Sequence, residues 1–174
     1  MKAKFLALLA AAFFLFSCGT TYNSTSDNAA YNVEIPVGIK SSFRAQYPDA
    51  TNIVWSNYDA ANVPIDWELN GWTPLQSNDY VATFVMGGDK YYSWYNANGD
   101  WIGSSFTVSD FSRIPYAVSS MLKDKYSTYT LENAQRASTT NKAVYQLNLK
   151  NAEDAKIVLL VDADGTVLKE KTNP

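Results

Sequence analysis

The chain has 174 residues, with 14 basic and 17 acidic side chains, no histidine and one cysteine. This length is typical of one domain or of two very small ones. The net charge of −3, without any cluster of Lys or Arg, argues against nucleic acid as a partner. The missing imidazole excludes Ser-His-Asp and Cys-His nucleophilic sites and most zinc sites, so we expect no enzyme activity, no metal and no cofactor.

The first 17 residues have the pattern of an export signal. Lys2 and Lys4 precede an uncharged apolar run over 5–16, which is too short to span a membrane. The residues Leu15-Phe16-Ser17-Cys18 resemble the bacterial lipobox, whose cysteine is lipidated and becomes the new N-terminus. The alternative is an ordinary secreted protein with a free thiol. The sequence therefore predicts a signal peptide over 1–17 and a lipid on Cys18.

The residues that follow Cys18 predict where the anchored domain lies. Gly19 and Thr20 stand where lipoproteins of the inner membrane tend to carry an acidic residue, so the resemblance implies an outer-membrane anchor. We expect the domain to face the periplasm. Residues 18–32 are rich in Ser, Thr and Asn and bury little apolar surface, which predicts a flexible tether.

Two stretches of the remaining chain show the same order of features, which predicts an internal duplication. Residues 36–48 and 115–127 each begin with proline and carry apolar side chains three to four positions apart, the pattern of a short amphipathic helix. The matched pairs are Ile39 and Val118, Phe43 and Leu122, and Tyr47 and Tyr126. We expect one repeat over 33–110 and a second over 111–174.

Each predicted repeat continues with short strands and ends in a hairpin. Asn98-Gly99 and Asp164-Gly165 lie between β-favouring runs and predict tight turns. Strands are expected over 52–55, 80–86, 90–95, 101–108, 131–138, 143–149, 155–161 and 166–171. The predicted fold is therefore α+β, a tandem repeat of a helix followed by a four-stranded antiparallel meander, with the helices packed on one sheet face. Residues 56–79 are an insertion with Trp67 and Trp72 as aromatic anchors.

Several motifs resemble the PepSY-like proteins, also described as β-lactamase-inhibitor-like, which are mostly exported or lipid-anchored. The motifs are Phe43-Arg44-Ala45-Gln46-Tyr47-Pro48-Asp49-Ala50, Val54-Trp55, Asn96-Ala97-Asn98-Gly99 and Asp162-Ala163-Asp164-Gly165-Thr166-Val167-Leu168. The resemblance covers nearly all of the chain from Pro36 onward. It implies helices on one face of an antiparallel sheet, an open opposite face and no catalytic residues. The insertion departs from the family pattern and is a candidate binding feature of this protein.

Aromatic side chains make up 14% of the chain and gather on the strand over 90–95. Side chains alternate along a strand, so Tyr91 and Tyr95 face one side while Tyr92 and Trp94 face the other. Only one side can pack under the helices, so the other shows its rings to solvent, to the insertion or to a partner. That these rings are core, or are covered by Trp67 and Trp72, is the competing interpretation. The strand with Val144, Gln146 and Asn148 predicts an ordinary solvated face instead.

The expected function is that of a lipid-anchored, non-enzymatic binding module of the cell envelope. Its expected partner is a protein or peptide, because Tyr and Trp dominate binding hot spots. Two alternatives remain: an inhibitor of an envelope hydrolase such as a protease or β-lactamase, and a carbohydrate-binding module. The candidate partner-binding residues are Asp89 at the Gly87-Gly88-Asp89 hairpin tip and the aromatic residues Tyr91, Tyr92, Trp94, Tyr95, Trp101, Trp67 and Trp72.

Overall fold

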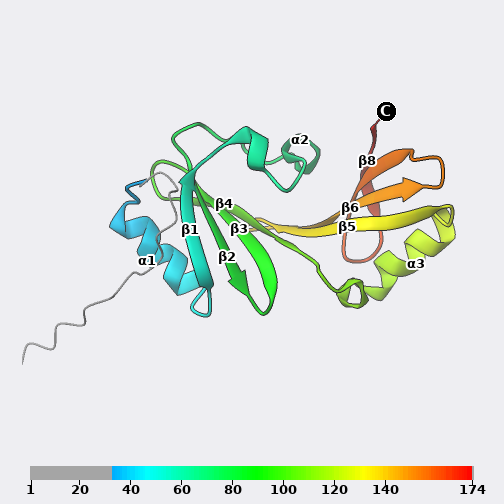
Figure 1. Cartoon of the computed structure of the whole chain (residues 1–174), viewed down its shortest axis with the longest axis horizontal. Helices are drawn as coiled ribbons and strands as arrows, with labels where there is room; N and C mark the ends of the chain where they lie inside the picture. The colour runs from blue at the N-terminus through cyan, green and yellow to red at the C-terminus, as the bar shows by residue number, and fades with distance from the viewer. Residues whose placement is uncertain (1–32, 174) are drawn as a thin grey trace, which may run out of the picture.

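The computed structural model describes residues 33–173, and one antiparallel sheet dominates it (Figure 1). Each of its eight strands pairs with the next strand along the chain. The strands are β1 (Thr51–Asn57), β2 (Tyr80–Met86), β3 (Asp89–Tyr95), β4 (Trp101–Thr107), β5 (Tyr129–Ser138), β6 (Ala143–Asn151), β7 (Lys156–Val161) and β8 (Val167–Asn173). The predicted signal peptide, Cys18 and the tether over 18–32 lie outside the described residues.

The predicted fold class is wrong, because the strands do not form two separate four-stranded units. Strand β4 pairs directly with β5, from Ser104 opposite Ser138 to Thr107 opposite Gln135, so the sheet is continuous. The helices are few and short, α1 (Val37–Gln46), α2 (Trp67–Asn70) and α3 (Tyr116–Lys125), and the chain is mostly β. Pairing β4 with β5 removes two strand edges that separate sheets would leave open to solvent.

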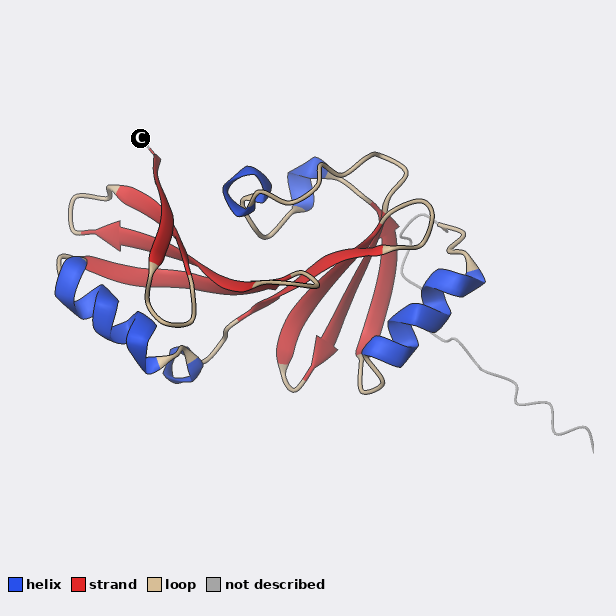
Figure 2. Cartoon of the chain, turned by 180° about the vertical axis from the view of Figure 1, so that it is seen from behind, coloured by secondary structure: helices blue, strands red, loops and turns tan. Residues whose placement is uncertain are grey.

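The two longer helices, α1 and α3, lie on one side of the sheet, here named the helix face, as Figure 2 shows. Helix α2 and the rest of residues 58–79 lie on the other side, here named the insertion face. The insertion contains one further short turn of 3₁₀-helix, Ala60–Asn62.

The individual strands lie within a few residues of their predicted positions. Alternating apolar side chains and tight turns are local signals, and here they were sufficient to locate the strands. Gly99, between β3 and β4, and Gly165, between β7 and β8, have φ of 94° and 84°. A Cβ atom at Gly165 would also lie 2.6 Å from the carbonyl oxygen of Ala117, so this turn packs closely against α3.

Two apolar clusters on the helix face fasten α1 and α3 to the sheet. Helix α1 buries Ile39 and Phe43 against β2 and β3, and α3 buries Val118 and Met121 against β5 to β7. Pro36 and Pro115 precede the two helices, where a missing N–H costs no helical hydrogen bond. No helix among residues 33–173 is long and apolar enough to cross a membrane.

A third apolar cluster lies on the insertion face and joins distant parts of the sheet. Ile65 and Leu69 of the insertion pack with Val81 and Trp94 of β2 and β3 and also with Val144, Val158 and Leu160 of β6 and β7. The predicted solvated face of β6 is therefore wrong at Val144 and Gln146, which are each only 4% exposed. The insertion covers these strands although it is far from them in sequence.

Candidate binding surface

The alternation predicted for β3 is confirmed, and it divides the candidate aromatic residues between the two sheet faces. On the helix face, Tyr91 stacks between Phe84 and Phe106, with ring centroids 5.3 Å and 4.7 Å away. Tyr95 is fully buried beside Trp55, and burial raises the pKa of its hydroxyl to about 12. Tyr91 and Tyr95 thus belong to the packing under the helices.

Trp101 and Asp89 also serve contacts within the protein. The indole N–H of Trp101 donates a hydrogen bond to Ser93 Oγ at 3.1 Å. Asp89 is 2% exposed, and its carboxylate lies 2.6 Å from Nη2 of Arg113. The hydrogen bond from Arg113 outweighs burial and lowers the pKa of Asp89. Asp89 therefore ties the β2–β3 turn to the segment before α3.

On the insertion face, three tryptophans form one edge-to-face cluster. The ring of Trp94 lies 5.1 Å from that of Trp67 and 5.8 Å from that of Trp72, and the latter two are 4.9 Å apart. Trp72 also lies over Gly103 of β4, where an added Cβ atom would come within 2.8 Å of the indole. Trp94 is consequently covered by the insertion and only 1% exposed, as the competing interpretation predicts.

Polar contacts hold the insertion to the later strands of the sheet. The side chain of Asp66 caps α2 by accepting from the N–H of Leu69 at 2.9 Å, and it lies 2.6 Å from Nζ of Lys171 on β8. Gln146 Oε1 accepts from the Asp66 N–H at 2.7 Å and from Asn70 Nδ2 at 3.1 Å. Burial opposes ionisation of Asp66, but Lys171 and the Leu69 N–H outweigh it and lower the pKa of Asp66.

A groove of about 550 Å³ remains open on the insertion face, between β1 to β3 and the first turn of the insertion. Its floor includes Tyr92, whose ring is nearly parallel to that of Trp94 at 6.1 Å. Nζ of Lys90 lies 5.1 Å from the centre of the Tyr92 ring, within the range of a cation–π contact. Tyr58 and Asp59 line the side of the groove next to the insertion.

Of the candidate residues, Tyr92 and Trp94 line this groove, and Tyr92 is the partly exposed one of the two, although its ring also packs against the apolar cluster of the insertion face. Sequence reasoning did not select the groove residues Trp55, Tyr58, Asp59 and Lys90. Side-chain alternation along the strand was sufficient to predict that Lys90 lies on the same face as Tyr92, two positions away. Asp59 and Tyr58 needed the path of the insertion, which no local pattern predicts.

Among residues 33–173, no group of three His, Cys, Asp or Glu side chains lies close enough together to hold a metal ion. No family model matches the chain, and no curated protein matches it in sequence.

Solved structures do resemble this chain. A DUF2874 family protein from Bacteroides uniformis is 18% identical, with a TM-score of 0.64 over 80% of this chain and 90% of the other. A BLIP-like protein from Bacteroides fragilis is 17% identical, with a TM-score of 0.64 over 80% of this chain and 87% of the other. A candidate periplasmic protein from Bacteroides eggerthii is 18% identical, with a TM-score of 0.63 over 80% and 90%.

The chain has a BLIP-like fold. At these identities the likeness concerns the fold alone. The β-lactamase-inhibitor-like part of the resemblance is thus confirmed at the level of the fold, whereas the PepSY part is not shown.

Proposed function

We propose that this protein is a non-enzymatic binding module of the cell envelope, anchored by a lipid on Cys18, and that it engages a protein or peptide in the groove beside β1. The observation that carries the proposal is the open groove around Tyr92 on the insertion face. An aromatic ring supported from behind by Trp94 offers a large contact area at low entropic cost. The likeness to a BLIP-like and to a candidate periplasmic protein supports both the binding role and the envelope location.

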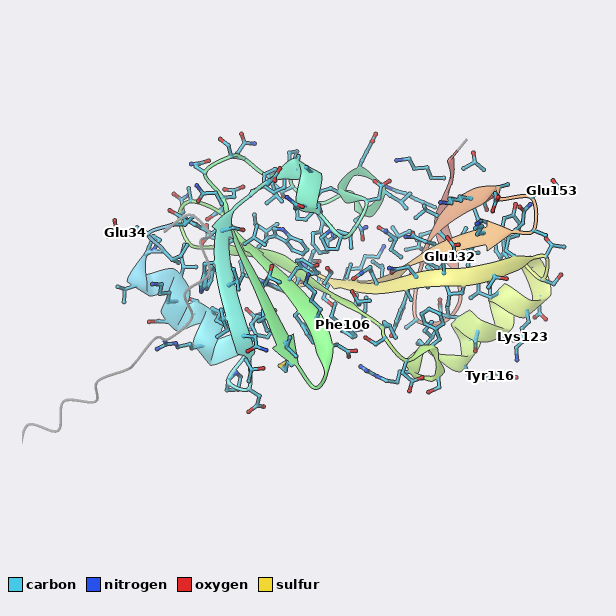
Figure 3. The ribbon with its side chains drawn as sticks, in the orientation of Figure 1. Glu34, Phe106, Tyr116, Lys123, Glu132 and Glu153 are labelled. Atoms are coloured by element: carbon cyan, nitrogen blue, oxygen red, sulfur yellow. The ribbon has the colours of Figure 1, made fainter. Side chains whose placement is uncertain are left out.

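Site-specific photocrosslinking of the full chain in intact cells tests this proposal. A photoreactive phenylalanine analogue at Tyr92 should capture a discrete protein or peptide that mass spectrometry identifies reproducibly. The matched control carries the same analogue at Tyr116, which is 84% exposed at the start of α3 (Figure 3). Identical products from both positions, or none from Tyr92, would contradict the proposal. A glycan as the only captured species would favour the carbohydrate-binding alternative.

A second candidate is an inhibitor of an envelope hydrolase, which the likeness to a BLIP-like protein favours. The purified chain should then inhibit at least one member of a panel of β-lactamases and proteases at micromolar concentration. The Tyr92→Ala variant should lose that inhibition. A panel without any inhibited enzyme counts against this candidate and leaves the more general binding role standing.

A further inference from the structure

Strand β1 forms one outer edge of the described sheet, and part of its backbone has no hydrogen-bond partner among residues 33–173. The N–H of Tyr58 donates to the carbonyl oxygen of Asp79 at 2.8 Å, so the backbone N–H of Tyr58 points toward β2. Backbone groups alternate in direction along an antiparallel strand, so those of Asn57 and Trp55 point away from β2. Within residues 33–173, no other residue hydrogen bonds to these outward groups.

The two edges of the sheet differ in how they are protected. Natural edge strands avoid unwanted pairing through charges, proline and bulges. Strand β8 carries Lys169, Glu170 and Lys171 in succession. Strand β1 has neither charge nor proline, and Val54 is 52% exposed. Its bulge lies between Thr51 and Val54 and leaves the segment 54–57 in regular pairing with β2.

The groove of the proposed function borders this same edge. Its lining includes five consecutive residues, 55–59, together with Val81 on the adjacent strand β2 and Tyr92 on β3, one strand further in. A strand added beside β1 would direct every second side chain to the insertion face, toward the groove. An apolar or aromatic side chain in the middle of such a strand would point into the groove, toward Tyr92 across β1 and β2.

The charges at the two ends of the groove predict which end of an antiparallel added strand is basic and which is acidic. Lys90 is opposite Val85, which is in turn opposite Thr51, so Lys90 lies near the start of β1. Asp59 follows the end of β1. Neither side chain forms an ion pair with any residue of the described part of the chain. An antiparallel strand would begin beside Asp59 and end beside Lys90.

We propose that β1 binds an extended peptide segment of a partner protein by antiparallel strand addition. The segment has a basic residue at its start, an apolar or aromatic residue in its middle and an acidic residue at its end. A second copy of β1 fits less well, because residues 51–57 carry no charge to match Lys90 and Asp59. This inference rests on the proposed function of the groove and adds the class of partner and its mode of binding.

Paired substitutions at Asn57 test the strand addition, using a synthetic heptapeptide with blocked ends as the probe. The peptide carries lysine first, phenylalanine in the centre and glutamate last, with threonine and valine between them. Asn57→Pro removes an outward N–H without touching the pairing with β2, whereas Asn57→Ala keeps the N–H and removes the same side chain. We expect the peptide to bind the Asn57→Pro full chain about tenfold more weakly than the Asn57→Ala full chain. Circular dichroism and the unfolding midpoint verify that both variants fold.

A second pair of probes tests the direction of binding. A twin peptide with glutamate first and lysine last should bind the natural chain more weakly than the original peptide. The Lys90→Glu chain should instead prefer the twin peptide, because the substitution replaces the positive charge expected to face the acidic end of the original peptide. Equal binding of both peptides to both chains would overturn the proposed direction.

Several outcomes separate this inference from the proposed function. No peptide binding, or equal binding to the Asn57→Pro and Asn57→Ala chains, overturns strand addition. A partner that crosslinks at Tyr92 in both variants would meanwhile keep the groove as the binding site. A dimer of the purified chain that Asn57→Pro dissociates would show that a second copy occupies the edge, and would overturn the peptide partner.

Discussion

The two faces of the sheet are built differently. On the helix face, apolar side chains of α1 and α3 form two clusters whose members lie on all eight strands. On the insertion face, one apolar cluster shares the surface with buried polar side chains, an ion pair and an open groove. Gln135, Gln146 and Ser105 are buried there although glutamine and serine are mostly exposed in proteins.

The helix face thus carries most of the apolar packing, whereas the proposed binding groove lies on the insertion face. Apolar packing by the short helices stabilises the sheet, and the recess of about 340 Å³ beside α3 is smaller than the groove of the insertion face. The insertion face instead combines a cover held by apolar contacts, hydrogen bonds and one ion pair with a partly exposed aromatic ring. Three changes test this division, beginning with the largest expected effect.

Removing a central ring from the helix face should destabilise the protein most. Phe43 is 1% exposed and contacts the rings of Tyr47, Trp55 and Phe84. Phe43→Ala should lower the free energy of unfolding by about 3–5 kcal/mol, because it removes buried surface and leaves a cavity. Urea denaturation measures this change. Val37→Ala on the same helix is the control, since Val37 is 80% exposed and the expected change is within about 0.5 kcal/mol.

Removing an aromatic anchor of the insertion should cost less and act locally. Trp72 is half-buried against Trp67 and Trp94, so we expect Trp72→Ala to lower the free energy of unfolding by roughly 1–3 kcal/mol. Limited proteolysis should show faster cleavage within 58–79 while the sheet stays intact. Cleavage spread evenly over the chain would mean that the insertion is part of one cooperative core with the helix face.

Breaking the ion pair between Asp66 and Lys171 should have the smallest effect, and that effect should depend on pH. The folded pKa of Asp66 lies below its usual 3.8, so the pair stabilises the insertion above about pH 4 and loses this as pH falls through the folded pKa. The folded pKa of Lys171 is raised by Asp66, so the contribution also fades as pH rises through that value.

Lys171→Ala should therefore speed proteolysis within 58–79 near neutral pH, and this effect should shrink as the pH falls below about 4, measured with an acid-active protease at the lower pH. Lys169→Ala is the matched control, because Lys169 is an exposed lysine of the same strand without a partner in the described ion pairs. Equal effects of the two substitutions at neutral pH would show that the pair with Asp66 does not hold the insertion.

Local sequence signals predicted the elements well and their assembly poorly. The alternation in β3 and the turn at Asp164-Gly165 depend on neighbours in the chain, and the structure confirms both. The pairing of β4 with β5 joins residues separated by a helix and a linker, and nothing in either strand specifies that partner. For this reason the predicted tandem arrangement was wrong although its strands were in place.

At the candidate site too, local signals predicted the direction of side chains but not which of them stay accessible. Tyr91, Tyr92, Trp94 and Tyr95 are adjacent and chemically alike, and the sequence predicts only that they alternate in direction. Which of them remains accessible depends on the insertion, because Trp67 and Trp72 cover Trp94 and leave Tyr92 at the groove.

By itself, the sequence determined the positions of the strands, the turns between them and the two faces of β3, because these follow from backbone geometry and from side chains a few positions apart. Only the tertiary structure decided that the eight strands form one sheet, that the insertion packs over its centre and that the outer edge of β1 has no partner among residues 33–173. Those features depend on contacts between distant segments, such as Asp66 with Lys171, whose free energy is available only after the chain has folded.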